Sequence, residues 1–141
     1  MGQNYYIDTC IWRDHYEDRY GQGGRPLGMI ASGLFFKLIK ENHTILFSEF
    51  IILELQKDYS DEDTHLMFNL LFLAGKVQKV SISKEIINDA RILSQERMIS
   101  CGDCLHAVLA RHYNAILITQ NEKDFKKLMD ITPFRKPEQI I

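Results

Sequence analysis

The chain alternates short β-rich runs with long stretches of helical spacing, and this alternation limits the folds that it can adopt. Residues 4–7, 44–47, 80–82 and 115–119 are rich in the residues that strands favour, and we expect a last short strand around Ile131. Strands that alternate with helices need right-handed crossovers, which place the strands parallel in a sheet covered on both faces. The sequence therefore predicts an α/β domain of three layers around a mostly parallel sheet.

Polar caps and apolar spacing place helices between these strands. Apolar residues repeat at three or four positions in the first helical stretch, as Ile30, Leu34 and Leu38 do, and one buried face requires this spacing. Asn114 suits the left-handed position that ends the last long helix, whereas the glycine-rich stretch 20–28 is expected to be a solvated loop. The expected helices lie within 29–42, after Ser48 through Lys57, over 61–75, and after the caps Ser83 and Ser100.

Composition indicates an ordinary globular chain, which we interpret as one domain over residues 1–141. The hydrophobic content is 45% and the net charge is −2, so any nucleic-acid contact must rely on local basic clusters. No apolar run approaches the roughly 20 residues of a membrane helix, so we expect a cytoplasmic protein. Three cysteines fit a reducing compartment. Cys10, Cys101, Cys104 and His106 lack a second paired motif, and a zinc site is not expected.

Four acids occupy unusual positions relative to the expected sheet. Asp8 directly follows the first strand, and Glu54 is the one acid in the apolar run "FIILEL". Asp103 lies in the first turn of the helix before the strand "AILIT", and Asp124 follows that strand, with Asn121 between them. Strand ends and helix starts meet at one edge of a parallel sheet. The four carboxylates are therefore expected to converge there.

Each acid also has an explanation that needs no catalysis. Asp103 would favour a helix N-terminus by roughly 0.3–1 kcal/mol, Asp124 could cap a loop, and Glu54 could face solvent. Asp8 is the hardest to explain in this way, because an unpaired charge at the end of a central strand is costly. The conjunction of all four acids therefore carries more weight than any one of them.

Carboxylates gathered at one edge predict a bound cation. Two carboxylates about 5 Å apart repel by roughly 3 kcal/mol at an effective dielectric of 20, so four need protons or cations. A set of oxygen ligands suits Mg²⁺ or Mn²⁺ better than zinc. Because these ions often bind substrate phosphates as well, phosphoryl transfer is the chemistry that we expect.

Several stretches together resemble the PIN-domain family, and in particular the VapC-like toxin ribonucleases. The similarity runs through "YYIDTCIW", "FSEFIILEL", "GDCLHAVLARHYNAILITQNEKDF" and "KPEQII", in the family's order and over essentially the whole chain. It implies a Rossmann-like α/β/α sandwich and a Mg²⁺- or Mn²⁺-dependent endoribonuclease. Asp8, Glu54 and Asp103 match the three core metal-binding acids of the family. Asp124 or Asn121 fills the fourth position.

We favour Asp124 as the fourth acid, with Asn121 as a polar supporter. Thr9, which follows the first acid, is expected to orient a carboxylate or a water. The resemblance also implies an RNA substrate, a small antitoxin partner and a homodimer. Candidates for holding RNA are Lys123, Lys126, Lys127, Arg111 and His112.

Two other functions remain open at this point. A PIN-fold protein that has lost activity could serve as a binding or assembly module. A phosphoaspartate switch or phosphatase also gathers acids at strand ends, but it needs a nucleophilic Asp and a lysine after a late strand. Lys123 follows the strand "AILIT" only after several intervening residues.

Overall fold

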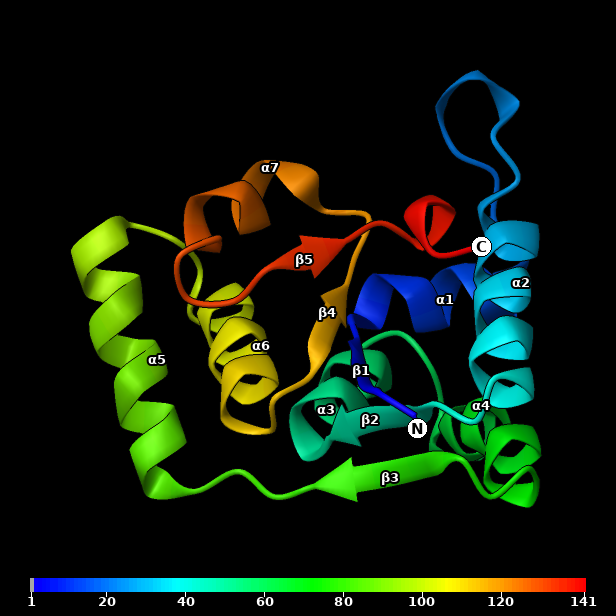
Figure 1. Cartoon of the computed structure of the whole chain (residues 1–141), viewed down its shortest axis with the longest axis horizontal. Helices are drawn as coiled ribbons and strands as arrows, with labels where there is room; N and C mark the ends of the chain where they lie inside the picture. Colours follow the sequence, from blue (N-terminus) through cyan, green and yellow to red (C-terminus); the bar gives the residue numbers. More distant parts are fainter. Residues whose placement is uncertain (1) are drawn as a thin grey trace.

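A five-stranded parallel sheet forms the centre of the computed structural model, which describes residues 2–141 except for the side chain of Leu70. The strand order is β3-β2-β1-β4-β5, and every neighbouring pair is parallel. Figure 1 shows α5 and α6 on one side of the sheet and α1 and α2 on the other. The predicted fold class is confirmed. The strands are β1 (Asn4–Ile7), β2 (Thr44–Ser48), β3 (Val77–Val80), β4 (Ile116–Ile118) and β5 (Phe134–Arg135).

The helices cover the positions that the caps indicated, with two additions, at Thr9–Glu17 and Glu122–Phe125. A helix begins directly after Asp8, which the sequence analysis did not predict, and the Asp8 carboxylate accepts the Thr9 backbone N–H at its start. Ser60, Ser83 and Ser100 each cap the helix that follows with the side chain. The helices are α1 (Thr9–Glu17), α2 (Leu27–Lys40), α3 (Glu49–Gln56), α4 (Asp61–Leu73), α5 (Lys84–Arg97), α6 (Cys101–His112) and α7 (Glu122–Phe125). Short 3-10 turns lie at Gln22–Gly24, Lys126–Leu128 and Pro137–Gln139.

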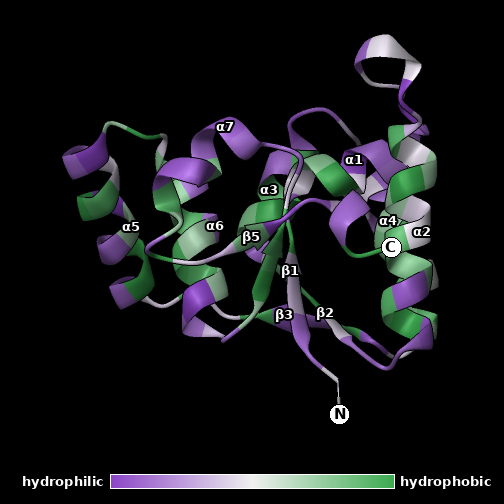
Figure 2. Cartoon of the chain, turned by 45° about the horizontal axis from the view of Figure 1, so that its top comes forward, coloured by the Kyte–Doolittle hydropathy of each residue, from purple (hydrophilic) through white to green (hydrophobic). Residues whose placement is uncertain are grey.

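The core lies against both faces of β1 and β4. Tyr6 and Leu117, which are register partners on these two strands, are both fully buried. Trp12 of α1 fills the space between α2 and α4, because its ring centroid lies 4.9 Å from that of Phe35 and 4.3 Å from that of Phe68. Figure 2 shows the hydrophobic colour over α3 and the hydrophilic colour over α7. Because the central strands are buried on both faces, their sequences are nearly continuous apolar runs.

Two strands and one helix face differ from the prediction. The third strand ends at Val80 instead of running to Ile82, and the last strand is Phe134–Arg135 instead of lying around Ile131. Ile131 follows a 3-10 turn and is only partly buried, so its apolar character reflects packing against the core and not strand pairing. The spacing of Ile86, Ile87, Ala90 and Leu93 predicts that all four line one buried face of α5, but Ile87 is 39% exposed. None of the helices in the described residues has the length and apolar content needed to span a membrane.

Candidate functional site

The carboxyl ends of three central strands form the edge at which the predicted acids lie. Asp8 follows β1, Ser48 ends β2, and Thr119 follows β4. Asp103 lies in the first turn of α6, and Glu54 lies in the second turn of α3, the helix that follows β2. The topology therefore brings together residues from four separate parts of the sequence.

Asp8 is held at this edge by donors from two strand ends. Its side chain is buried, and Oδ1 accepts the backbone N–H of Thr9 at 2.8 Å. Oδ2 accepts the hydroxyl of Thr119 at 2.6 Å, and the Cys10 thiol lies 3.5 Å from the same oxygen. The Thr119 hydroxyl in turn accepts the backbone N–H of Asn121 at 2.9 Å. A buried charge is tolerated here because both of its oxygens have partners.

Glu54 uses one carboxylate oxygen for two hydrogen bonds. Oε1 accepts the hydroxyl of Thr9 at 2.6 Å and lies 2.7 Å from Nε2 of His106. Burial alone would raise the pKa of Glu54, but the contacts with His106 and Thr9 outweigh it and hold the pKa below its usual value. The other oxygen, Oε2, faces Gly102, since a Cβ atom built there would lie 3.9 Å from it.

Thr9 lies between the two acids of this part of the site. Its backbone N–H bonds Asp8 and its hydroxyl bonds Glu54, so one residue links both carboxylates. We refer to Asp8 and Glu54 as the inner pair. Both members are charged groups with protein hydrogen-bond donors already in place.

His106 is a functional candidate that sequence reasoning did not identify in this role. Its side chain is buried, its Nδ1 lies 2.9 Å from the Tyr6 hydroxyl, and its Nε2 also lies 3.6 Å from Asp8 Oδ1. The Tyr6 hydroxyl lies 2.8 Å from Oγ of Ser48. Burial lowers the pKa of His106, but the hydrogen bond to Glu54 and the nearby Asp8 charge raise it above its usual value. The available signal was spacing, because a residue three positions after Asp103 lies on the same helix face.

Asp103 and Asp124, which we call the outer pair, face each other at the open side of the edge. Burial and the charges of Asp8 and Asp124 raise the pKa of Asp103 to about 6, despite the hydrogen bond with Ser100. The Asp124 pKa is lowered, first by its hydrogen bond with Asn121 and then by Asp103, Lys127 and Lys123. Asp103 therefore binds its proton more tightly than an ordinary Asp does.

Asn121 begins α7 and fixes the position of Asp124. The Asn121 Nδ2 donates to Asp124 Oδ2 at 3.1 Å, and Asn121 Oδ1 accepts the Asp124 backbone N–H at 3.3 Å. Of the two residues that the sequence left open for the fourth position, Asp124 therefore has its side chain next to Asp103. Asn121 supports it from the helix cap.

The carboxylates share an edge without forming a complete metal cage. Within residues 2–141 as described, no group of three or more His, Cys, Asp or Glu side chains is arranged so that it could hold a metal ion. The donor set itself consists of carboxylate oxygens, which are the ligands that Mg²⁺ and Mn²⁺ prefer.

The predicted basic residues separate into two groups. Lys123 and Lys127 act on the charge of Asp124 and so lie near the outer pair. Arg111 and His112 lie in the last turn of α6, roughly 12 Å along the helix from Asp103 at 1.5 Å per residue. They share a helix with Asp103 but lie near its other end, and their role in holding RNA stays a prediction.

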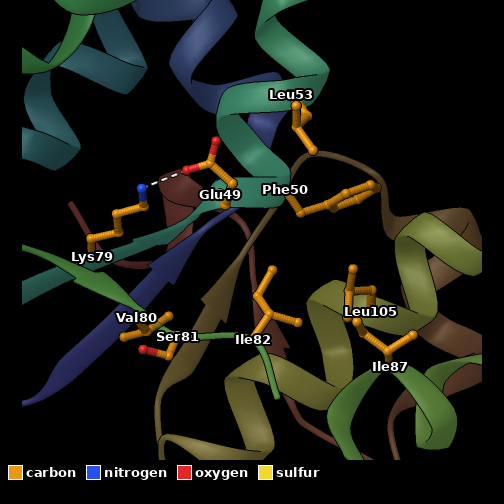
Figure 3. A pocket seen from close by; sticks show the side chains of 9 residues that line it. All are labelled: Glu49, Phe50, Leu53, Lys79, Val80, Ser81, Ile82, Ile87 and Leu105. Carbon is orange, nitrogen blue, oxygen red and sulfur yellow. Dashed lines mark hydrogen bonds and ion pairs between the residues drawn. The ribbon is translucent and has the colours of Figure 1, made fainter. Parts of the chain in front are cut away.

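A cavity of about 710 Å³ adjoins the inner pair from the side of α3. Figure 3 shows Phe50 and Leu53 of α3 across from Leu105 of α6 and Ile87 of α5, with the ion pair between Lys79 and Glu49 at one side. None of the four predicted acids lines this cavity. Its mostly apolar wall contrasts with the charged edge beside it.

Comparison with known proteins gives one family and several similar folds. The sequence matches the family model described as PIN domain over residues 5–130. None of the curated proteins matches the chain. The structure of VapBC2 from Rickettsia felis, bound to a DNA fragment from their promoter, is 22% identical with a TM-score of 0.67 and coverage of 95% of this chain and 98% of that chain. VapBC-1 from nontypeable Haemophilus influenzae is 17% identical with a TM-score of 0.68, covering 96% of this chain and 99% of that chain.

A third similar structure is FitAcB from Neisseria gonorrhoeae, with 17% identity and a TM-score of 0.59. The match covers 95% of this chain and 98% of that chain. These likenesses support the fold over nearly the full length of the chain.

Proposed function

The chain belongs to the PIN-domain family, and from this premise we propose that it is a metal-dependent endoribonuclease. The observation that carries the proposal is the convergence of an inner and an outer acid pair on one edge of the sheet. PIN domains are generally nucleases, and the acids supply the ligand chemistry that phosphodiester hydrolysis needs.

The metal in this proposal is Mg²⁺ or Mn²⁺, held by Asp8, Glu54, Asp103 and Asp124. When bound, such an ion offsets the charge of the phosphodiester and activates water for attack. Glu54 has Oε2 available for a ligand, because its two hydrogen bonds both use Oε1. Burial, together with the negative charges of Asp8 and Asp124, raises the pKa of Asp103, and neighbouring negative charges favour a bound cation.

The remaining residues bind and orient the substrate in this proposal. Lys123 and Lys127 lie close enough to Asp124 to affect its charge, so their ammonium groups can attract an RNA phosphate to the outer pair. Thr9 orients the inner pair by bonding both of its members. Single-stranded RNA is the expected substrate.

The biological role that we propose is the toxin of a toxin-antitoxin pair. The similar structures include VapBC proteins and a toxin-antitoxin complex from Klebsiella pneumoniae. We therefore expect a small antitoxin protein as partner, and a homodimer of this chain. Light scattering of the purified protein gives the oligomeric state, and co-expression with neighbouring small reading frames identifies the partner.

The decisive experiment compares RNA cleavage by the wild type, Asp8→Asn and Asp103→Asn. Wild type should cleave single-stranded RNA in Mn²⁺ and not in excess chelator, and each variant should lose at least about 100-fold in rate. Asp89→Asn, an exposed acid on α5 that pairs with Arg111, is the matched control and should keep wild-type activity. Cleavage that persists in chelator, or in either active-site variant, would refute the proposal.

Two other outcomes identify the competing functions. Protein that cuts no RNA in Mn²⁺ but binds a partner tightly is a binding or assembly module. Phosphate transfer to Asp8 would identify a phosphoaspartate enzyme. The structure offers that reaction little support, because Asp8 is 7% exposed and both of its oxygens already accept hydrogen bonds.

A further inference from the structure

We propose that His106 is a positioning residue that aims the Glu54 carboxylate into the acid site. The proposal rests on the nuclease function proposed above and adds a residue to it. The observation is a relay of four side chains from four elements, in which each contact is a hydrogen bond. The chain of contacts runs from Ser48 through Tyr6 and His106 to Glu54.

The directions of these hydrogen bonds follow from the chemistry of the groups. The Glu54 carboxylate can only accept, so His106 Nε2 carries the hydrogen and donates it to Oε1. At Nδ1 a neutral imidazole accepts from the Tyr6 hydroxyl and an imidazolium donates to it, so this hydrogen bond is present in either form. The hydrogen bond between the hydroxyls of Ser48 and Tyr6 completes the relay.

The relay fixes which oxygen of Glu54 faces the acids. His106 and Thr9 reach Oε1 from two different elements, at 2.7 and 2.6 Å, and together they determine the orientation of the carboxylate. Oε2 is left pointing to the start of α6 beside Asp103, where Gly102 has no side chain to block it. Without the His106 donor, the carboxylate would be free to rotate about its last torsion.

Burial makes this arrangement specific. Ser48 and Tyr6 are fully buried and His106 is 1% exposed, so none of them can replace a lost partner with bulk water. Phe50 covers the imidazole, with ring centroids 5.1 Å apart. A buried histidine with both nitrogens hydrogen-bonded could contribute to the stability of the fold alone. The test must therefore separate an effect on stability from an effect on the orientation of the Glu54 carboxylate.

The test compares His106→Leu, which removes the donor, with His106→Gln, which keeps an N–H near the position of Nε2. The measured quantities are Mn²⁺ affinity by calorimetry and, separately, kcat and KM for single-stranded RNA. We expect His106→Leu to weaken Mn²⁺ binding by about 10–100-fold and to lower kcat with little change in KM. His106→Gln should recover most of both losses.

Tyr6→Phe keeps the ring and removes only the hydroxyl that orients the imidazole, so it tests the proposal even if His106→Leu fails to fold. It should weaken Mn²⁺ binding in the same direction, by a smaller factor. Tyr59→Phe is the matched control, because the Tyr59 hydroxyl is buried with no hydrogen-bond partner among the described residues. This control should bind Mn²⁺ like the wild type.

The outcomes separate this inference from the proposed function. A wild type that neither binds Mn²⁺ nor cleaves RNA refutes the nuclease proposal. If the wild type is active and folded Tyr6→Phe or His106→Leu matches it in Mn²⁺ affinity and kcat, the positioning role is wrong. A folded His106→Gln as weak as His106→Leu overturns it as well, since the restored donor would then have no effect.

Discussion

The inner and outer pairs hold negative charge at the same edge by opposite means. Asp8 and Glu54 receive hydrogen bonds from Thr9, Thr119 and His106, so the protein supplies their stabilisation. Asp103 and Asp124 instead lie against each other, and the pKa of Asp103 rises to about 6 because burial and two carboxylates disfavour its charge.

This difference indicates that the two pairs have different roles in the site. The inner pair is oriented before any ligand arrives, and hydrogen bonds of this kind preorganise a site. The outer pair carries unbalanced charge, so a cation changes its energy most. We therefore predict that replacing an acid lowers the free energy of unfolding in the inner pair but not in the outer pair. A bound metal ion should raise it mainly through the outer pair.

The largest expected effect is stabilisation by Mn²⁺. A ligand that binds only the folded state at 100 times its dissociation constant raises the free energy of unfolding by about 2.7 kcal/mol. Wild type in Mn²⁺ should show this increase over wild type in chelator in urea denaturation at pH 7. Asp103→Asn should lose most of it, whereas the control Asp89→Asn should keep it. If Mn²⁺ stabilises Asp103→Asn as much as the wild type, the outer pair does not bind the metal ion.

The positions of Asp8 and Glu54 at the sheet edge could be predicted, because they follow from topology. Once strands and helices alternate, any residue at the end of a central strand must lie at the edge where ligands bind. Asp8 was the clearest case, since its charge interrupts an apolar run. The start of α1 was missed because the same residue that marks the edge also caps a helix.

The relay through His106 could not be predicted in the same way. Its members come from β1, β2, α3 and α6, and their contacts depend on side-chain reach between elements. In sequence, His106 was considered only together with the three cysteines as a zinc site, which was not expected. Cys101 is exposed and Cys104 buried, so the two thiols do not share one environment.

The second prediction compares Asp8→Asn with Asp103→Asn in metal-free protein. Asp8→Asn replaces one acceptor oxygen with an amide that cannot accept the hydrogen bonds now made, and it should cost about 2 kcal/mol of unfolding free energy. Asp103→Asn removes a charge that two carboxylates oppose, so it should leave stability unchanged or raise it slightly. Urea denaturation in chelator at pH 7 measures both. Equal losses in the two variants would contradict the division into pairs.

The smallest effect concerns Asp14, a buried acid that lies on α1 outside both pairs. Burial, together with Glu17 and Glu138, raises its pKa to about 6 against the opposing charge of Arg19. The folded state therefore binds this proton more tightly than the unfolded state, where an Asp has a pKa near 3.9. The contribution of Asp14 to stability is present below about pH 4 and is lost as pH rises toward about 6.

Asp14→Asn removes this dependence, because the amide stays neutral at every pH. The variant should match wild type near pH 4 and exceed it by about 1 kcal/mol at pH 7, since solvent screens part of the charge. The difference between the two unfolding free energies, measured across this range, isolates Asp14 from the other titrating groups. A constant difference, or one that shrinks as pH rises, would show that Asp14 is stabilised by partners as the inner pair is.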